Sequence, residues 1–267
     1  MPETVHSQSL PPSPADTVRA DATQTDASRT RTPNGASTRL LALPRPRLWA
    51  LWGIVLAAAV VALGITVADV PGISTDELGV DQSLSRHHVA LLTGVAMALN
   101  VLFGPVTGVL LIAAVALFLL LVRRAPVNAV AFGLVAVSGW AASEFFKVLV
   151  ARQRPDSALL FDPLAPENGA DSFPSGHVTF AVTLAFAVYF LARGTRRAKF
   201  AAVAGVVVVA LVAWSRLYIG VHYPSDVAGS LLAGTAAVIL VSGCWNWLAP
   251  RVWQRVPVNA VTRPFLP

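Results

Sequence analysis

The chain has 267 residues, of which 55% are hydrophobic and only 13% are charged, and its mean hydropathy is +0.64. Average proteins carry about 25% charged residues, so this composition excludes an ordinary soluble domain and favours a membrane protein. The formal net charge is +6. Nucleic-acid-binding proteins share this sign, but here the basic residues stand at the ends of apolar runs, as in membrane proteins. We therefore expect a bilayer as partner and no nucleic acid.

Residues 1–40 form a polar segment that is rich in Ser, Thr, Pro, Asp and Arg and has almost no aromatic residues. Such a segment cannot bury enough apolar surface to offset the entropy of ordering it. We expect it to be a disordered cytoplasmic tail. A membrane domain is expected over residues 41–255, followed by a second short cytoplasmic tail over residues 256–267.

Apolar runs long enough to cross a bilayer follow this segment, since crossing takes roughly 20 apolar residues in a helix. The sequence predicts an all-α fold, an integral membrane bundle of six transmembrane helices. After the first span we expect a mostly interfacial helix over residues 80–100, which ends before the break at Gly104 and Pro105. The six spans are predicted over residues 48–68, 105–122, 127–149, 175–192, 200–217 and 226–248.

Basic residues gather before the first span, between the second and third, between the fourth and fifth, and after the sixth. These four positions fall on one face, which the positive-inside rule identifies as cytoplasmic, together with both termini. The opposite, non-cytoplasmic loops nevertheless hold Arg152, Arg154 and Arg216. Positive charge on that face calls for a functional explanation.

Three clusters of polar residues stand at the non-cytoplasmic ends of the predicted spans. Although they are far apart in the sequence, the topology brings three cations, two histidines and one carboxylate to one end of the bundle. The clusters are Lys147 with Arg154 and Pro155, then Phe173-Pro174-Ser175-Gly176-His177, then Ser215 and Arg216 with His222 and Asp226.

The cations and the helix start of this set suit a phosphate group. Lys147, Arg154 and Arg216 can together neutralise a phosphate dianion, and a guanidinium fork matches two phosphate oxygens at once. Ser175 and Gly176 stand where the fourth span begins, and free N–H groups at a helix start bind anions. Gly176 permits close backbone approach. The Ser175 hydroxyl can either cap the helix or donate to a phosphate oxygen.

The two histidines can divide the chemical work. A neutral imidazole can attack phosphorus when a carboxylate holds its other nitrogen, and Asp226 is the nearest candidate to orient His222. His177 can protonate the leaving alkoxide and later activate water. A zinc site is the alternative for two histidines and an aspartate, but three neighbouring cations would repel a divalent ion. We therefore expect neither a metal nor another cofactor.

The three clusters resemble the three-part motif of the type 2 phosphatidic acid phosphatase superfamily, also called lipid phosphate phosphatases. The motif is complete and in order, and the resemblance covers residues from about 48 to 248. It implies a six-helix bundle and a phosphohistidine intermediate formed without a metal. By position it implies His222 as the nucleophile, Asp226 as its partner, His177 as the general acid, and Lys147, Arg154, Ser175, Gly176 and Arg216 as phosphate ligands.

Four residues near these clusters lie outside the motif, and the sequence leaves two interpretations open for Arg152 and for Glu144. Arg152 lies outside the motif and either helps to bind a pyrophosphate or faces lipid headgroups. Glu144 either pairs with Lys147, one helical turn away, or faces water. His87 and His88 stand beside Arg86 in a polar stretch, and we expect both to be solvated.

The sequence predicts a membrane phosphatase that hydrolyses a lipid phosphate or pyrophosphate on the non-cytoplasmic face. Phosphatidic acid, phosphatidylglycerol phosphate and a polyprenyl phosphate or pyrophosphate all fit as substrates. A phosphotransferase with the same intermediate is the alternative enzyme. A non-enzymatic transporter or scaffold fits less well, because the polar groups concentrate at one end of the spans rather than along their middle.

Overall fold

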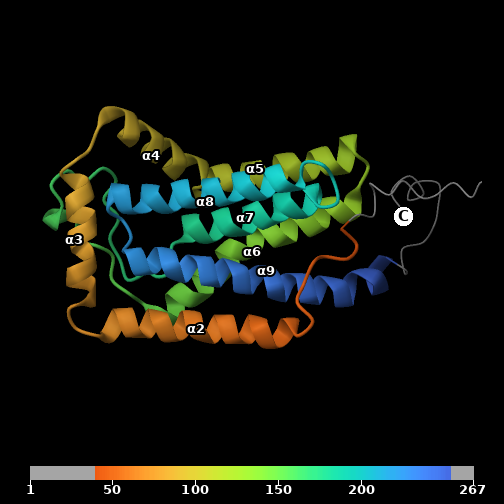
Figure 1. Cartoon of the computed structure of the whole chain (residues 1–267), viewed down its shortest axis with the longest axis horizontal. Coiled ribbons are helices and arrows are strands. Elements are labelled where there is room, and N and C mark those ends of the chain that lie inside the picture. The colour runs from red at the N-terminus through yellow and green to blue at the C-terminus, as the bar shows by residue number, and fades with distance from the viewer. Residues whose placement is uncertain (1–39, 254–267) are drawn as a thin grey trace, which may run out of the picture. The chain divides into compact units, whose positions relative to one another are not determined.

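The computed structural model describes residues 40–253, and within that range it contains helices and no strand (Figure 1). The all-α prediction is therefore confirmed. The expected tails, residues 1–40 and 256–267, lie outside this range except for Leu40, which is buried rather than part of a tail. The helices are α2 (Trp49–Asp69), α3 (Ile73–Ser85), α4 (Ala90–Leu102), α5 (Pro105–Leu117) with the π-helical turn η1 (Phe118–Val122), α6 (Pro126–Val150), the 3-10 turn η2 (Ser157–Leu159), α7 (Gly176–Ala192), α8 (Ala198–Ile219) and α9 (Pro224–Trp253).

In the described part of the chain, five segments are long and apolar enough to cross a membrane, so the chain is an integral membrane protein. The fourth predicted span corresponds to α7, which is apolar but has only 17 residues. The count of six full-length spans is therefore not reproduced. The five segments are Trp49–Asp69, Pro105–Val122, Pro126–Val150, Ala198–Ile219 and Pro224–Val252.

Helix α7 lies at the centre of the bundle, in contact with α6, α8 and α9. Its contact with α6 is close at Gly139. A Cβ atom added there would lie 2.7 Å from the carbonyl oxygen of Thr179 and 2.4 Å from the hydroxyl of Thr183. The Thr183 hydroxyl donates to the carbonyl oxygen of Ala136 at 2.9 Å. The absence of a side chain at Gly139 thus lets the two helix backbones approach.

The single interfacial helix predicted over residues 80–100 is wrong, because two helices, α3 and α4, occupy this stretch. The turn between them is bound to α8 by His88, whose Nε2 lies 2.8 Å from the carbonyl oxygen of Tyr218. The backbone N–H of Val89 donates to the Tyr218 hydroxyl at 2.9 Å. The His88 side chain is only 7% exposed, so the prediction that it is solvated is also wrong. His87 is exposed, as expected.

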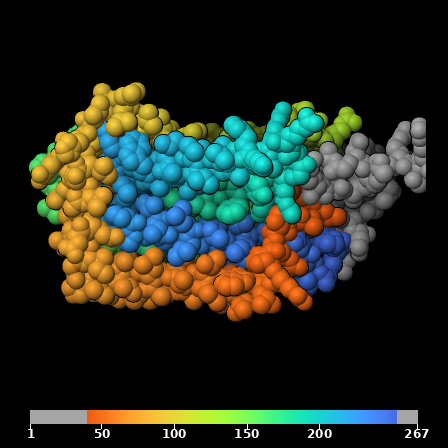
Figure 2. All heavy atoms as spheres, viewed as in Figure 1, coloured from red at the N-terminus to blue at the C-terminus, as the bar shows by residue number. Residues whose placement is uncertain are grey.

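Helix α3 runs across one end of the bundle and α4 runs obliquely, whereas the long helices α2, α6, α8 and α9 run along the bundle (Figure 1). In the space-filling view, atoms of α3 and α4 cover this end on the side that faces the reader (Figure 2). Helix α3 contacts α2, α8 and α9. Helix α3, of which only residues 80–85 belong to the segment expected at the membrane interface, therefore lies across the end where the three polar clusters gather.

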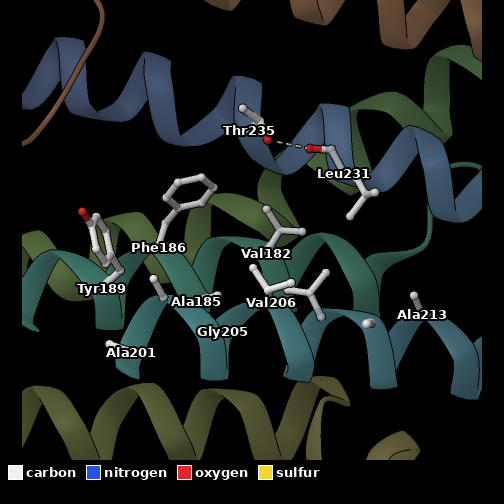
Figure 3. Close-up of a pocket in the computed structure, with 13 residues that line it drawn as sticks. Val182, Ala185, Phe186, Tyr189, Ala201, Gly205, Val206, Ala213, Leu231 and Thr235 are labelled. Carbon is white, nitrogen blue, oxygen red and sulfur yellow. Dashed lines mark hydrogen bonds between the residues drawn. The ribbon is translucent and has the colours of Figure 1, made fainter. Parts of the chain in front are cut away.

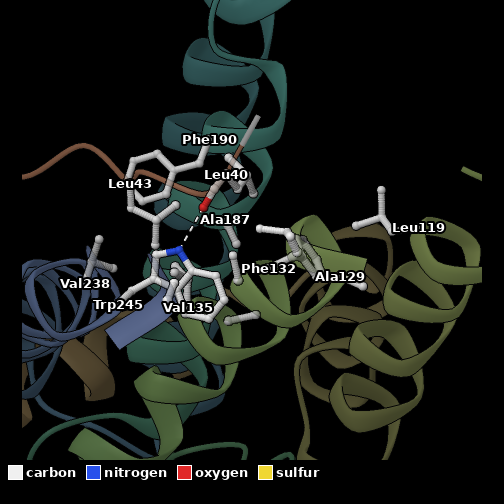
Figure 4. Packing of buried hydrophobic residues seen from close by; sticks show 14 residues of the cluster. Leu40, Leu43, Leu119, Ala129, Phe132, Val135, Ala187, Phe190, Val238 and Trp245 are labelled. Carbon is white, nitrogen blue, oxygen red and sulfur yellow. Dashed lines mark hydrogen bonds between the residues drawn. The ribbon is translucent and has the colours of Figure 1, made fainter. Parts of the chain in front are cut away.

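At the opposite end, the segment before the first span packs into the bundle. The indole N–H of Trp245 donates to the carbonyl oxygen of Leu40 at 2.8 Å (Figure 4). Asn246 exchanges two hydrogen bonds with the backbone of Leu43, at 2.7 and 2.8 Å. Leu40 and Leu43 are both 3% exposed and contribute to a buried cluster with Phe132. These contacts fix the start of the membrane domain onto α6 and α9.

The close approach of α6 and α7 at Gly139 predicts how a substitution there changes stability. Gly139→Ala should lower the free energy of unfolding by about 1–3 kcal/mol, because a methyl group would meet the α7 backbone. The measurement is the midpoint of thermal unfolding in detergent. Gly133→Ala is the matched control in the same helix, since nothing lies within 4 Å of a Cβ atom there. Equal midpoints for the two variants would contradict the packing described here.

Candidate active site

The three predicted clusters meet at the end of the bundle that α3 crosses (Figure 1). The last turn of α6 supplies Lys147, and the loop that follows it supplies Arg154. The first turn of α7 supplies Ser175, as its N-cap, and His177. The last turn of α8, the connection to α9 and the first turn of α9 supply Arg216, His222 and Asp226.

His222 lies between α8 and α9 and is 2% exposed. Its Nδ1 is 3.4 Å from Oδ2 of Asp226, a contact that is too long and poorly aligned to count as a good hydrogen bond. Its Nε2 faces the other way and lies 3.4 Å from Nη1 of Arg154. The imidazole therefore stands between a carboxylate on one side and a guanidinium on the other.

The surroundings of His222 favour its neutral form. Burial lowers the pKa of this imidazole most, and the charges of Arg154 and Arg216 lower it further. Asp226 acts in the opposite direction, but the net pKa lies below the ordinary value. The ring is thus neutral at pH 7, which is the form that a nitrogen nucleophile needs.

Asp226 is completely buried and is held by three donors. Its Oδ2 accepts hydrogen bonds from the Ser172 hydroxyl at 2.5 Å and from the backbone N–H of Tyr223 at 2.9 Å. Its Oδ1 accepts a hydrogen bond from Nη1 of Arg152 at 2.7 Å. It also lies in the first turn of α9, where the helix dipole favours negative charge. These contacts fix the carboxylate that faces His222.

Arg216 has no exposed surface, and within residues 40–253 none of its three guanidinium nitrogens has a hydrogen-bond partner. The Ser175 hydroxyl is also buried, and no partner for it lies in that range. It does not cap α7, so the capping alternative for this side chain is wrong. Burying an unpaired cation is costly, because a charge removed from water needs partners nearby. An anion beside Arg216 would supply them.

The other two cations are paired with acidic side chains. Arg154 donates to both oxygens of Asp171, at 2.8 and 3.1 Å, and its Nη1 lies 2.8 Å from Glu167. Lys147 lies 2.8 Å from Glu144, so of the two readings of Glu144 the paired one is correct. The hydrogen bond from Arg154 holds the pKa of Asp171 below its usual value. Glu167 and Asp171 belong to no predicted cluster.

His177 and Gly176 open the central helix. Nε2 of His177 lies 3.1 Å from the carbonyl oxygen of Asn100 at the end of α4, which orients the ring. Arg216 and His222 are close enough to His177 to interact with it electrostatically. A Cβ atom at Gly176 would lie 3.8 Å from Nζ of Lys147. The start of α7 therefore lies directly beside the last turn of α6.

Arg152 has neither of the roles that we considered for it. Its side chain is 2% exposed and binds Glu77 of α3 and Asp226 of α9, at 2.7 Å each. Its two Nη atoms are thus each paired with a carboxylate, and the side chain faces neither headgroups nor a pyrophosphate. Glu77 is one of four acidic residues that follow the first span closely in the sequence, the others being Asp69, Asp76 and Asp81. Nothing in the sequence pairs two residues that are 75 positions apart.

An apolar groove with a volume of about 520 Å³ lies between α7, α8 and α9 (Figure 3). Val182 and Phe186 of α7 form its floor, and Gly205 of α8 and Leu231 of α9 lie along its sides. Ala213, also in its lining, lies one helical turn before Arg216. The groove thus runs along the bundle from the level of the polar clusters.

In a comparison with known proteins, residues 127–250 match the family model of the PAP2 superfamily. The putative undecaprenyl-diphosphatase YbjG of Escherichia coli (strain K12) is 35% identical over 86 residues, 32% of this chain and 41% of that protein. Phosphatidylglycerophosphatase B of Bacillus subtilis (strain 168) is 34% identical over 106 residues, which is 38% of this chain and 50% of that protein. Lipid A 1-phosphatase of Rhizobium johnstonii is 33% identical over 141 residues, which is 48% of this chain and 54% of that protein.

The chain thus matches about half the length of these curated relatives. Among solved structures, it resembles the crystal structure of the first transmembrane PAP2 type phosphatidylglycerolphosphate phosphatase from Bacillus subtilis. The TM-score is 0.59 at 24% identity, and the match covers 73% of this chain and 93% of that one, which supports the fold. Residues 127–250, which match the PAP2 superfamily model, contain all three polar clusters.

Proposed function

We propose that this chain is a membrane phosphatase that hydrolyses the phosphate or pyrophosphate group of a lipid through a phosphohistidine on His222. The observation that carries the proposal is the guanidinium of Arg216. It is fully buried, without a partner among residues 40–253, at the same end of the bundle as a neutral histidine. A phosphate group bound there would supply the missing negative charge and the missing acceptors.

In the first step, Nε2 of His222 attacks phosphorus, so that a P–N bond forms and the P–O bond to the lipid breaks. Asp226 faces Nδ1 and stabilises the proton on that nitrogen while the ring becomes positively charged. His177 gives a proton to the departing oxygen. In the second step water attacks the phosphohistidine, His177 takes a proton from it, and the P–N bond breaks to release inorganic phosphate and neutral His222.

The phosphate oxygens are held by the cations and by the start of α7. Arg216 and the hydroxyl of Ser175 have donors available, and the free N–H groups of the first turn of α7 add others. Lys147 and Arg154 exchange their carboxylate partners for phosphate oxygens when the substrate enters. No step needs a metal ion. The donors of Arg216 and Ser175, which have no partner among residues 40–253, stabilise the negative transition state as preorganised donors.

The lipid part of the proposal rests on location and relationship. The site lies at the end of apolar spans, and the groove beside α8 offers apolar surface one turn below Arg216. The relatives named above are a putative undecaprenyl-diphosphatase, a phosphatidylglycerophosphatase and a lipid A 1-phosphatase. Their common feature is a phosphate carried by a membrane lipid, and we assign this class of substrate to the chain.

We also propose that the site faces the non-cytoplasmic side, with both termini in the cytoplasm. The support is the distribution of charge over the described residues. The end of the bundle opposite the site carries most of the basic residues of the membrane domain, and such residues remain on the cytoplasmic side. They are Arg45, Arg47, Arg123, Arg124, Arg193, Arg196, Arg197, Lys199 and Arg251.

The catalytic proposal predicts that purified protein in detergent releases inorganic phosphate from phosphatidic acid or a polyprenyl pyrophosphate with a chelator present. His222→Ala should reduce the rate by roughly a thousandfold or more, as expected for loss of a nucleophile. His87→Ala, at an exposed histidine of the same end, should keep the full rate. Activity that survives in His222→Ala, or that requires added divalent metal, would refute the mechanism.

The orientation predicts which loops react with a membrane-impermeant maleimide on intact cells. The background is Cys244→Ser, since Cys244 is the single cysteine of the chain. Ala158→Cys, exposed in the loop beside the site, should be labelled on intact cells. Thr195→Cys, in the loop between α7 and α8, should be labelled only after permeabilisation. The reverse pattern would place the site in the cytoplasm.

A further inference from the structure

The guanidinium of Arg152 joins three elements beneath His222. Nη1 donates to Asp226 at 2.7 Å and to the Ser225 hydroxyl at 2.6 Å, both in the first turn of α9. Nη2 donates to Glu77 at 2.7 Å and to the Ser74 hydroxyl at 3.0 Å, both in α3. One cation that follows α6 thus binds a carboxylate of α3 and a carboxylate of α9. It does so while almost completely buried.

Glu77 makes a second set of contacts with the start of α9. Its Oε1 accepts a hydrogen bond from the backbone N–H of Ser225 at 2.9 Å, and its Oε2 accepts one from the Ser225 hydroxyl at 2.7 Å. A carboxylate that accepts from the first N–H groups of a helix caps it and complements its dipole. The turn of α9 that carries Asp226 is therefore capped by a side chain of α3.

The carboxylates around Arg152 determine how much of its positive charge acts on Asp226. Burial raises the pKa of Asp81 to about 8, with further contributions from Asp226 and Glu77, so Asp81 is protonated at neutral pH. Arg152 then shares its single charge between two ionised carboxylates, Glu77 and Asp226. On its other side Asp226 faces His222, which in turn faces Arg154.

We propose that Glu77 and Arg152 are positioning residues, which hold Asp226 in place and set how strongly it polarises His222. Helix α3 then belongs to the catalytic apparatus rather than only to the membrane interface. The effect on turnover rests on the function proposed above, whereas the effect on the charge of His222 does not. Neither residue lies in a cluster that the sequence singled out.

Neutralising Glu77 and neutralising Arg152 should shift the pH at which His222 titrates in opposite directions. In Glu77→Gln, Arg152 pairs with Asp226 alone, so Asp226 supports a positive imidazole less and His222 titrates at lower pH. In Arg152→Gln, Asp226 loses its counter-charge, so it supports a positive imidazole more and His222 titrates at higher pH. A variant that merely loosens the fold would not shift the titration in two directions.

The experiment is an NMR titration of ¹⁵N-histidine-labelled full-length protein in detergent, with the His222 signal assigned by its loss in His222→Ala. Asp76→Asn is the matched control, because Asp76 precedes Glu77 in α3 but is exposed. We expect a downward shift of the His222 titration in Glu77→Gln, an upward shift in Arg152→Gln and none in Asp76→Asn. Thermal unfolding of each variant is recorded alongside. If Arg152→Gln does not fold, the downward shift in Glu77→Gln, measured against Asp76→Asn, decides the inference alone.

Kinetics on the same variants separate this inference from the proposed function. Glu77→Gln should reduce kcat by roughly 10- to 100-fold with KM unchanged, because it alters the support of the nucleophile and no phosphate ligand. If the wild type hydrolyses no lipid phosphate, the function fails, and the NMR titration still decides the positioning role. A folded Glu77→Gln protein whose His222 titrates as in Asp76→Asn would overturn the inference.

Discussion

The guanidinium of Arg216 is the feature on which the site depends. It is buried in the last turn of α8, and its nitrogens have no hydrogen-bond partner among residues 40–253. An apolar bundle can hold such a charge only if another group compensates for it, and the neighbouring groups are arranged accordingly. The hydroxyl of Ser175 is left without a partner in the same range, and the start of α7 contributes free N–H groups. The imidazole of His222 stays neutral beside these cations.

The short central helix places these groups at one level. Helix α6 continues for one turn beyond Lys147 to Val150, whereas α7 begins at Gly176, beside Lys147. The start of α7 is thus set back from the end of its neighbour, and its free N–H groups lie inside the bundle rather than at its outer edge. Gly139 allows this arrangement, because it lets α6 and α7 approach along their length. Packing in the apolar core and anion binding at the end of the bundle are therefore linked.

The sequence predicted the features that depend on local chemistry. Hydropathy located the helices, because a long apolar run has few alternatives to a membrane-spanning helix. Charge at the ends of those helices brought Lys147, Arg154, Arg216, His222 and Asp226 to one face, and the structure places them together. The turn between α3 and α4 was missed, because it is fixed by His88 and Tyr218, which are 130 positions apart. Arg152 with Glu77, and Arg154 with Asp171, were missed for the same reason, since each pairing is a tertiary contact with no pattern along the chain.

The most direct test of the account is isolation of the phosphorylated enzyme. Purified protein is mixed with a lipid whose phosphate carries ³²P, the reaction is quenched with base within milliseconds, and the labelled peptide is identified by mass spectrometry. The account predicts an acid-labile, base-stable phosphate on His222, which forms before inorganic phosphate appears and decays as it is released. Two results would contradict the account. One is label on a residue other than His222, and the other is steady-state release of phosphate without any label in the peptide that contains His222.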